Sequence, residues 1–412
     1  MELLRLSKPD RLLYGDIVLD GSKSISNRAL IVLALAGADP ADWLDRLSTS
    51  KDTTTLYRLL GHSGDTFDAG DAGTTFRFLT AYLALQPGVQ ILTGSARMRE
   101  RPVGGLVEAL RSIGADIAYL GKEGYPPLRI GALKPRQGRA VVRMHAGTSS
   151  QFLSALLMIG PYLPEGLELI PEGRLVSRPY LDMTLQLMRY FGGVAEWRGD
   201  TVAVAPGRYQ PKRFTVEADW SAASYWYAMA ALADDADVRL RGLFSDSWQG
   251  DSVVVKIMQQ FGIQTTVSDK FLRLKKSDLA PGAHFQWDFT DCPDIAQTLA
   301  VVCAGMGVTG QFSGLETLFV KETDRVSALQ AELAKVGVSF GEQVAGSGQF
   351  GVAGKAHWRG IPRFATYGDH RMAMSFAPLA LRGPIEIENP SVVAKSYPAF
   401  WEHLKTAGFR TD

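Results

Sequence analysis

Cysteine and histidine are scarce in this chain of 412 residues, which holds two cysteines and six histidines. Cys292 and Cys303 are too few for a disulfide framework, and the histidines are too scattered to complete a zinc cluster with them. We therefore expect a protein of the reducing cytoplasm that uses no metal.

An excess of charge and a long apolar run are also missing. The formal net charge of +1 gives no long-range field that would hold a nucleic acid. No run of 18 apolar residues indicates a membrane span, and the first ten residues mix charges with apolar residues, unlike a signal peptide. We expect neither a nucleic acid nor a membrane as a partner, and we expect a monomer.

What is present is typical of a globular protein with two domains. The chain is too long for one ordinary core, and its 46% hydrophobic and 21% charged residues are close to globular averages.

One type of segment occurs six times along the chain. Each copy is a small polar cluster that runs into an apolar stretch rich in alanine and leucine. The copies occupy residues 21–37, 70–85, 146–160, 218–233, 291–305 and 368–381.

The six stretches are hydrophobic almost all round, which is typical of helices buried between other layers. Each begins with Ser, Thr, Asp or Gly, and we expect these residues to cap the helices. Short runs such as VQILTG, DVRLRGL, IQTTVSD and PIEIENP predict strands between them. The pattern indicates an α/β protein with three repeats in each half and a boundary just before the fourth copy.

Several helix starts that carry cations would make an anion site. A helix N-terminus has unpaired N–H groups and about half a positive charge. Lys23 and Arg28 flank the first start, Arg77 follows the second, and Arg371 lies in the sixth. A cleft between the halves would bring these cations together.

Two more charged segments allow alternative interpretations. Arg97, Arg99 and Arg101 precede a predicted helix, but a run of this kind is more often a solvated loop. In KETDR the spacing places Arg325 on the same helical face as Glu322 and Lys321, which is also common at a surface helix start.

The order of these motifs along the whole chain resembles the family of 5-enolpyruvylshikimate-3-phosphate synthases. The resemblance rests on GSKSISNRA, DAGTTFR, RMRERPVGGLVEAL, YPPL, GTSSQF, LVSRPY, QGD, KETDR, GDHRMAM and KSYP. It implies two similar domains, each of three βαβαββ-type repeats with buried helices, known as the inside-out α/β barrel of enolpyruvyl transferases.

The resemblance also implies how the domains divide the work. Residues 21–218 would form the domain on the side of shikimate 3-phosphate. Residues 1–20 with 219–412 would form a discontinuous domain on the side of phosphoenolpyruvate, with the active site in the cleft between the two.

The family transfers the enolpyruvyl group of phosphoenolpyruvate to the 5-hydroxyl of shikimate 3-phosphate and releases phosphate. By motif, the residues implied for shikimate 3-phosphate are Lys23, Ser24, Arg28, Ser149, Ser150, Gln151, Ser177, Tyr180, Asp294 and Lys321. Those implied for phosphoenolpyruvate are Lys23, Gly73, Arg101, Gln151, Arg325, Arg371 and Lys395.

The chemistry needs an acid and a base, because the methylene carbon gains a proton while the attacking hydroxyl loses one. We assign Asp294 to the hydroxyl proton, and Glu322 with Lys23 to the methylene proton. Fixed cations already stabilise the carboxylate and the leaving phosphate, so we expect no cofactor.

Three positions depart from the family pattern. Asp71 replaces the usual Asn, and it either caps the following helix or alters the binding of phosphoenolpyruvate. Phe78 is bulkier than usual, and Thr317 stands where many relatives have Asn. Gly73 and Thr74 are unchanged, which implies inhibition by glyphosate, a competitor of phosphoenolpyruvate in the family.

Two other functions compete with this interpretation. One is the related enolpyruvyl transferase that acts on UDP-N-acetylglucosamine, but it usually carries a reactive cysteine in the first half, and both cysteines here lie in the second. The other is a non-catalytic phosphosugar-binding relative, which would be expected to lose an acid or a base.

Overall fold

The structure, a computed structural model, describes residues 2–145, 147, 149–279 and 281–412. The chain divides into two compact units, an inserted unit, Gly21–Val216, and a split unit, Met1–Asp20 with Glu217–Asp412. The second division falls between Val216 and Glu217, two residues before the predicted boundary. The reason is local pairing: β12 (Phe214–Thr215) pairs with β3 (Leu44–Asp45), whereas Glu217 accepts a 2.9 Å hydrogen bond from the backbone N–H of Phe244.

The inserted unit contains two four-stranded sheets of one pattern, in which a parallel pair is followed by two antiparallel pairings. In spatial order the first sheet is β4 (Thr66–Asp68), β5 (Val89–Thr93), β7 (Leu128–Gly131) and β6 (Asp116–Tyr119). The second is β8 (Ala140–His145), β9 (Leu167–Glu172), β11 (Thr201–Val204) and β10 (Ala195–Arg198).

The split unit contains three four-stranded sheets of the same pattern. The first is β16 (His284–Asp288), β17 (Thr309–Ser313), β19 (Phe350–Ala353) and β18 (Ser339–Glu342). The second is β2 (Leu12–Val18), β13 (Asp235–Arg241), β15 (Leu272–Lys276) and β14 (Ile263–Val267). The third is β20 (Arg363–Phe364), β21 (Ile385–Glu388), β1 (Leu3–Ser7) and β22 (Arg410–Thr411). The N-terminal strands β1 and β2 thus complete two sheets of the split unit.

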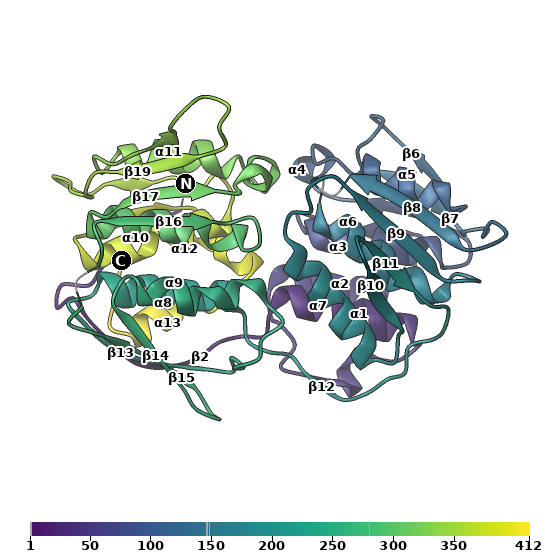
Figure 1. Cartoon of the computed structure of the whole chain (residues 1–412), viewed down its shortest axis with the longest axis horizontal. Coiled ribbons are helices and arrows are strands. Elements are labelled where there is room, and N and C mark those ends of the chain that lie inside the picture. Colours follow the sequence, from purple (N-terminus) through teal and green to yellow (C-terminus); the bar gives the residue numbers. More distant parts are fainter. Residues whose placement is uncertain (1, 146, 148, 280) are drawn as a thin grey trace. The chain divides into compact units, whose positions relative to one another are not determined.

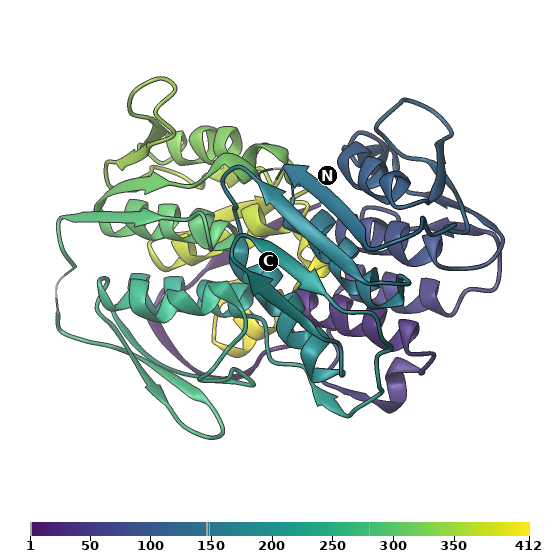
Figure 2. The same ribbon diagram turned by 45° about the vertical axis from the view of Figure 1, so that its right-hand side comes forward.

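The predicted α/β repeat is confirmed by this topology. The order β16, α10 (Ala296–Met306), β17, α11 (Arg325–Ala334), β18 and β19 is one βαβαββ repeat. The order β8, α6 (Ser150–Ile159), β9, α7 (Arg178–Tyr190), β10 and β11 is another. Figure 1 shows α6 behind β8 and β9 and α10 behind β16 and β17, and Figure 2 shows the same ribbons from a second side. The repeat that contains β3 has no β-hairpin, because the chain passes directly from α2 (Lys51–Leu60) to β4. The sheet of this repeat therefore consists only of the parallel pair β3 and β12.

The six predicted buried helices are confirmed. They are α1 (Lys23–Leu35), α3 (Gly73–Ala84), α6 (Ser150–Ile159), α8 (Trp220–Leu232), α10 (Ala296–Met306) and α12 (His370–Phe376). All thirteen residues of α8 are buried, as a helix that is apolar all round requires. The sixth stretch continues from α12 into a 3-10 turn, η6 (Ala377–Leu381), where Pro378 cannot donate an α-helical hydrogen bond.

The expectation that every one of these helices is capped by a side chain is wrong. Ser149, Asp219 and Asp369 cap α6, α8 and α12 through their side chains. At α1, α3 and α10 the capping residue makes no side-chain cap bond in the described part of the chain. Ala72 and Ile295 occupy the cap positions of α3 and α10, and neither has a side-chain acceptor.

The remaining helices are shorter or more amphipathic. They are α2, α4 (Ala96–Arg99), α5 (Gly104–Ser112), α7 (Arg178–Tyr190), α9 (Val254–Gln259), α11 (Arg325–Ala334) and α13 (Phe400–Thr406). The prediction that KETDR forms a helical turn is wrong, because Asp324 caps α11 by accepting a hydrogen bond from Ser327 N–H and Lys321 and Glu322 precede the helix.

Gly21, the first residue of the inserted unit, is in close contact with another part of the backbone. A Cβ atom at this position would lie 2.0 Å from the carbonyl oxygen of Arg46. We expect Gly21→Ala to destabilise the protein by about 3 kcal/mol, because the contact is with backbone and cannot relax by a change of rotamer.

Thermal unfolding measures this effect, and Gly207→Ala is the matched control because no atom lies within 4 Å of its added Cβ. Equal melting temperatures for the two variants would contradict the prediction.

Candidate active site

Lys23 is the first residue of α1 and is held by a carboxylate. Its Nζ lies 3.3 Å from Oδ2 of Asp52 in α2, and the side chains are 13% and 4% exposed. The sequence prediction missed Asp52, although it follows the serine that caps α2. The ammonium group is therefore fixed at the start of α1 and still reachable from solvent.

Arg28, one turn further along α1, is a buried cation whose neighbours are neutral. Its Nε donates to Thr184 at 2.7 Å, Nη2 donates to Ser154 at 2.9 Å, and Nη1 donates to the carbonyl of Ser24 at 2.9 Å. The ring of Tyr180 lies 5.8 Å from the guanidinium carbon. No carboxylate among the described residues forms an ion pair with Arg28, so its charge remains available to an anion.

Burial lowers the pKa of the Arg28 guanidinium to about 10. The group therefore keeps its proton at neutral pH. Three of its five N–H donors are used by the contacts above, which leaves two for a ligand.

Two arginines converge on the start of α3. A Cβ on Gly73 would lie 2.4 Å from Nη1 of Arg101 and 2.6 Å from Nη1 of Arg77. Arg77 also donates a 3.0 Å hydrogen bond to the Oε1 of Gln151, whose Nε2 donates to Thr74 at 3.0 Å. A side chain at position 73 would have to displace these guanidinium groups from the start of α3. The sequence indicated Arg77 as a cation near a helix start, but Arg77 was not among the residues expected to bind either substrate.

The predicted serines of the inserted unit lie at helix starts. Ser149 caps α6 by accepting a hydrogen bond from Gln151 N–H, and Ser150 is the first residue of that helix. Ser177 precedes α7 in a left-handed conformation, with φ of 58°, and is 4% exposed. Left-handed backbone is strained for a serine, and strain of this kind clusters at functional sites.

Arg325 is the centre of the candidate residues in the split unit. It is 1% exposed, and its Nε lies 2.7 Å from Asp369, its Nη1 3.1 Å from Asp294 and its Nη2 3.0 Å from Glu322. Burial alone would lower the pKa of Arg325, but the three carboxylates raise it above its usual value. Nη2 also donates to Asp369 at 3.3 Å, so one N–H of the guanidinium remains for a ligand.

Asp294 lies in a 3-10 turn, η4 (Pro293–Ile295), among three cations. Its Oδ1 lies 3.6 Å from Lys321 Nζ in addition to Arg325, and its Oδ2 accepts from Arg371 Nη2 at 2.9 Å. Burial lowers the pKa of Lys321, and Asp294 opposes this shift. The aspartate is 14% exposed, so it is fixed in orientation but remains reachable.

Glu322 bridges two cations, because its Oε2 contacts Arg325 and its Oε1 lies 3.3 Å from Lys395 Nζ. Asp294, Lys321, Glu322, Arg325, Arg371 and Lys395, all predicted as site residues, therefore belong to one ionic network. Asp369 holds this network together and was missed, although it is the capping residue of the sixth predicted helix.

The departures Asp71 and Phe78 have local partners. Asp71 is exposed, and its Oδ1 accepts a hydrogen bond from the hydroxyl of Ser95. Ser95 in turn caps α4 by accepting from Met98 N–H. The ring of Phe78 lies 5.3 Å from the guanidinium carbon of Arg28 and so lines the surroundings of that cation.

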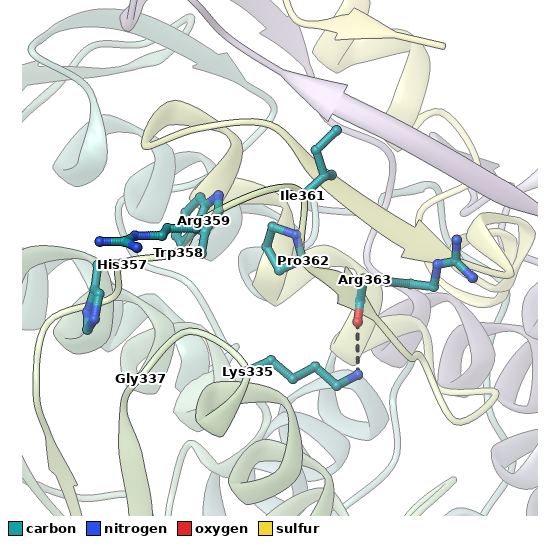
Figure 3. A pocket seen from close by; sticks show the side chains of 8 residues that line it. All are labelled: Lys335, Gly337, His357, Trp358, Arg359, Ile361, Pro362 and Arg363. Carbon is teal, nitrogen blue, oxygen red and sulfur yellow. Dashed lines mark hydrogen bonds between the residues drawn. The ribbon is translucent and has the colours of Figure 1, made fainter.

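A surface hollow of about 690 Å³ in the split unit contains none of the predicted residues. Figure 3 shows that Lys335 turns its ammonium group toward the carbonyl oxygen of Arg363, a contact of 2.8 Å. The same ammonium group is 2.6 Å from the buried Glu332. Its charge is satisfied within the protein, and the hollow is separate from the ionic network.

In the described part of the chain, no group of three or more His, Cys, Asp or Glu side chains is arranged to hold a metal ion. No described helix is long and apolar enough to cross a membrane.

The fold occurs in solved structures of EPSP synthase. An EPSP synthase from Acinetobacter baumannii superposes with a TM-score of 0.77 over 100% of both chains at 21% identity. A second structure of that enzyme gives a TM-score of 0.74 over 100% of this chain and 99% of the other, at 20% identity. The repeated architecture is therefore the fold of these two EPSP synthase structures.

Sequence comparison gives the particular family. The profile of EPSP synthase (3-phosphoshikimate 1-carboxyvinyltransferase) matches residues 57–404. A 3-phosphoshikimate 1-carboxyvinyltransferase of Bacteroides fragilis is 44% identical over 98% of this chain and 97% of its own. The enzyme of that name from Cellvibrio japonicus is 37% identical over 98% of each chain. The chain belongs to the EPSP synthase family.

The buried ion pair of Arg325 with Asp369 yields a prediction about stability. We expect Asp369→Ala to lower the free energy of unfolding by about 3 kcal/mol, because it removes the closest partner of a buried guanidinium and a helix cap. Urea unfolding followed by circular dichroism measures the change.

Asp246→Ala is the control for this experiment, because Asp246 is an exposed aspartate of the same unit. Its effect should stay within about 0.5 kcal/mol. A similarly small effect for Asp369→Ala would show that the ion pair adds little to stability.

Proposed function

We propose that the protein transfers the enolpyruvyl group of phosphoenolpyruvate to the 5-hydroxyl of shikimate 3-phosphate and releases phosphate. Membership of the EPSP synthase family supports the reaction. The structural observation that supports it best is the network in which Asp294 and Glu322 are both held by cations.

The inserted unit would supply the groups for shikimate 3-phosphate. Arg28 has a charge without a carboxylate partner and N–H donors to spare, which suits a phosphate. The hydroxyls of Ser24, Ser149, Ser150 and Ser177, the amide of Gln151 and the ring of Tyr180 suit the alcohols and the carbon face of the substrate. Asp294 and Lys321 of the split unit would complete the set.

Phosphoenolpyruvate would bind to cations of both units. Arg371 and Lys395 each contact one carboxylate of the network and are 9% and 12% exposed, so they can also meet a ligand. Arg101 and the start of α3 at Gly73 would contribute from the inserted unit, together with Gln151 and Lys23. Arg325 has one N–H left, so its main part is to hold Asp294 and Glu322 in place.

The proposed proton transfers follow from these positions. The methylene carbon of phosphoenolpyruvate takes a proton from Glu322 with Lys23, and the adjacent carbon becomes electrophilic. The 5-hydroxyl oxygen bonds to that carbon while Asp294 takes its proton. The group that gave the first proton, Glu322 with Lys23, then takes a proton back from the new methyl group, the methylene forms again, and phosphate leaves with the electron pair of the C–O bond.

The enzyme that modifies UDP-N-acetylglucosamine is a weaker candidate for this chain. Cys292 and Cys303 are 2% and 0% exposed, and burial raises the pKa of both thiols above the usual range. A reactive cysteine needs an accessible thiolate, which neither residue provides. A non-catalytic relative is disfavoured because Lys23, Asp294 and Glu322 are all present.

Phosphate release from phosphoenolpyruvate tests the proposal. The purified protein should release phosphate with shikimate 3-phosphate and not with UDP-N-acetylglucosamine or without an acceptor. In Lys23→Met the rate should fall about 1,000-fold, because a group that moves a proton and contacts both substrates is lost.

Lys51→Met is the control, since Lys51 is an exposed lysine at the start of the neighbouring helix α2. If the wild-type protein releases no phosphate that depends on shikimate 3-phosphate, the proposed function is wrong. Retained turnover in Lys23→Met would remove only this lysine from the mechanism.

The crowded start of α3 yields a separate prediction. In Gly73→Ala the new methyl group must displace the guanidinium groups of Arg101 and Arg77, which lie 2.4 and 2.6 Å from its position. We expect KM for phosphoenolpyruvate to rise at least about tenfold, the value of one charge-assisted hydrogen bond, with a smaller change in kcat. Steady-state kinetics at saturating shikimate 3-phosphate measure both constants.

Gly61→Ala is the matched control because the nearest atom to its added Cβ is 3.9 Å away. An unchanged KM for phosphoenolpyruvate in Gly73→Ala would exclude Arg101 and the start of α3 from its binding site.

A further inference from the structure

Asp251 is a buried carboxyl group that the proposed mechanism does not use. It lies in a 3-10 turn, η3 (Gly250–Val253), in the split unit and is 4% exposed. Its Oδ2 accepts a hydrogen bond from the hydroxyl of Ser221 at the start of α8. No donor among the described residues reaches its Oδ1. A buried carboxylate with a single hydrogen bond is costly in its charged form.

The charged neighbours of Asp251 are those of the catalytic network. Burial raises the pKa of Asp251 to about 7, and the negative charge of Asp294 adds to the shift. Arg371 opposes it, the Ser221 hydrogen bond opposes it further, and Asp219 at the cap of α8 adds a small rise. The thiol of Cys292 also faces Asp251, but its own raised pKa keeps it neutral. The adjacent helix α9 carries one cation, Lys256, and its ammonium group lies over the ring of Trp287, 5.9 Å from the ring centre.

Arg371 stabilises the charged forms of both Asp251 and Asp294, but the other surroundings of the two carboxyl groups differ. Asp294 contacts Lys321, Arg325 and Arg371, whereas Asp251 has one hydroxyl donor. Two neighbouring carboxyl groups in such different surroundings separate into one that stays charged and one that holds a proton. The geometry therefore places the exchangeable proton on Asp251.

Arg371 connects this proton to the substrate. It is one of the cations proposed to bind phosphoenolpyruvate, and its Nη2 contacts Asp294 at 2.9 Å. An anion bound at Arg371 adds negative charge near Asp251, and a like charge favours the protonated form of a carboxyl group. Binding of the anion and protonation of Asp251 must then favour each other.

We propose that Asp251 is a positioning residue that takes up a proton when phosphoenolpyruvate binds, so that Arg371 faces the substrate and one carboxylate, Asp294, instead of two. The inference rests on the proposed function, because it places phosphoenolpyruvate at Arg371. Asp251, in the turn η3, would thus determine how the affinity for phosphoenolpyruvate depends on pH.

The sign of the effect follows from the linkage. Below pH 7 Asp251 already carries its proton, and phosphoenolpyruvate binds without further change. Above pH 7 Asp251 must take up a proton when phosphoenolpyruvate binds, and the proton concentration falls as pH rises. KM for phosphoenolpyruvate therefore rises with pH. If the bound substrate raises the pKa of Asp251 by about one unit, KM rises about tenfold between the two limits.

The experiment measures KM for phosphoenolpyruvate from pH 6 to 9 at saturating shikimate 3-phosphate in wild type, Asp251→Asn and Asp246→Asn. The asparagine side chain keeps an acceptor for the Ser221 hydroxyl but cannot titrate. In Asp251→Asn, KM for phosphoenolpyruvate should therefore lack the rise of about tenfold with pH. Asp246→Asn removes an exposed carboxylate five residues earlier and should follow the wild type. Ionisation of the substrates is common to all three proteins and cancels in the comparison.

Ser221→Ala tests the same proton without changing Asp251. It removes the hydrogen bond that favours the charged carboxylate, so the rise in KM should move to higher pH. An unchanged midpoint, or parallel curves for wild type and Asp251→Asn, overturns the inference. Absence of phosphate release that depends on shikimate 3-phosphate in the wild type overturns the proposed function as well, so the two failures are distinguishable.

Thermal unfolding provides a readout that does not need turnover. The pKa of Asp251 is raised from an ordinary 3.8 to about 7, so the folded wild type loses stability as pH rises between these values. Asp251→Asn lacks this titrating group and does not lose this stability. Its melting temperature relative to the wild type should therefore increase from pH 5 to pH 7 and then stay constant. A difference that does not change with pH would show that Asp251 does not hold the proton.

Discussion

The arrangement of the split unit depends on one buried guanidinium. Arg325 is almost inaccessible to solvent and contacts Asp294, Glu322 and Asp369 together. A buried charge must be paired, and a planar group with five donors can orient several carboxylates at once. The two proposed catalytic carboxylates are therefore fixed by the same side chain, and Asp369 links that side chain to the start of α12. Arg371, the second residue of the helix, is positioned as a consequence.

Arg28 of the inserted unit and the cations of the split unit lie in opposite electrostatic surroundings. In the inserted unit, Arg28 is surrounded by hydroxyls, a carbonyl and aromatic rings, so its positive charge is not neutralised by the protein. In the split unit, the four cations Lys321, Arg325, Arg371 and Lys395 meet the carboxylates Asp294, Glu322 and Asp369. The first arrangement suits recognition of an anion, and the second suits proton transfer next to one.

Local patterns gave good predictions wherever a short segment decides its own structure. The alanine-rich stretch around Trp226 was predicted to be a buried helix and forms α8, and the run DVRLRGL was predicted to be a strand and lies for most of its length within β13. Predictions failed where a neighbouring segment decides the outcome. The cap position of α3 is Ala72 and not a polar residue, and Lys321 and Glu322 lie before α11 because Asp324 provides its cap. Asp52 and Asp369 were overlooked because each is one acidic residue at a helix start until its cation is placed beside it.

The sequence by itself determined the class of the protein, the six buried helices and the order of the motifs, because periodicity and motif spacing are properties of short segments. Its resemblance to the EPSP synthase family also implied Asp294, Glu322 and the cations around them as site residues. Only the tertiary structure decided which charges are paired, since Asp294, Arg325 and Arg371 are far apart along the chain and meet through packing of η4, α11 and α12. It alone distinguished Asp251, whose burial beside Asp294 raises its pKa to about 7, from the other aspartates. Ionisation depends on burial and on neighbouring charges, and both are consequences of the fold.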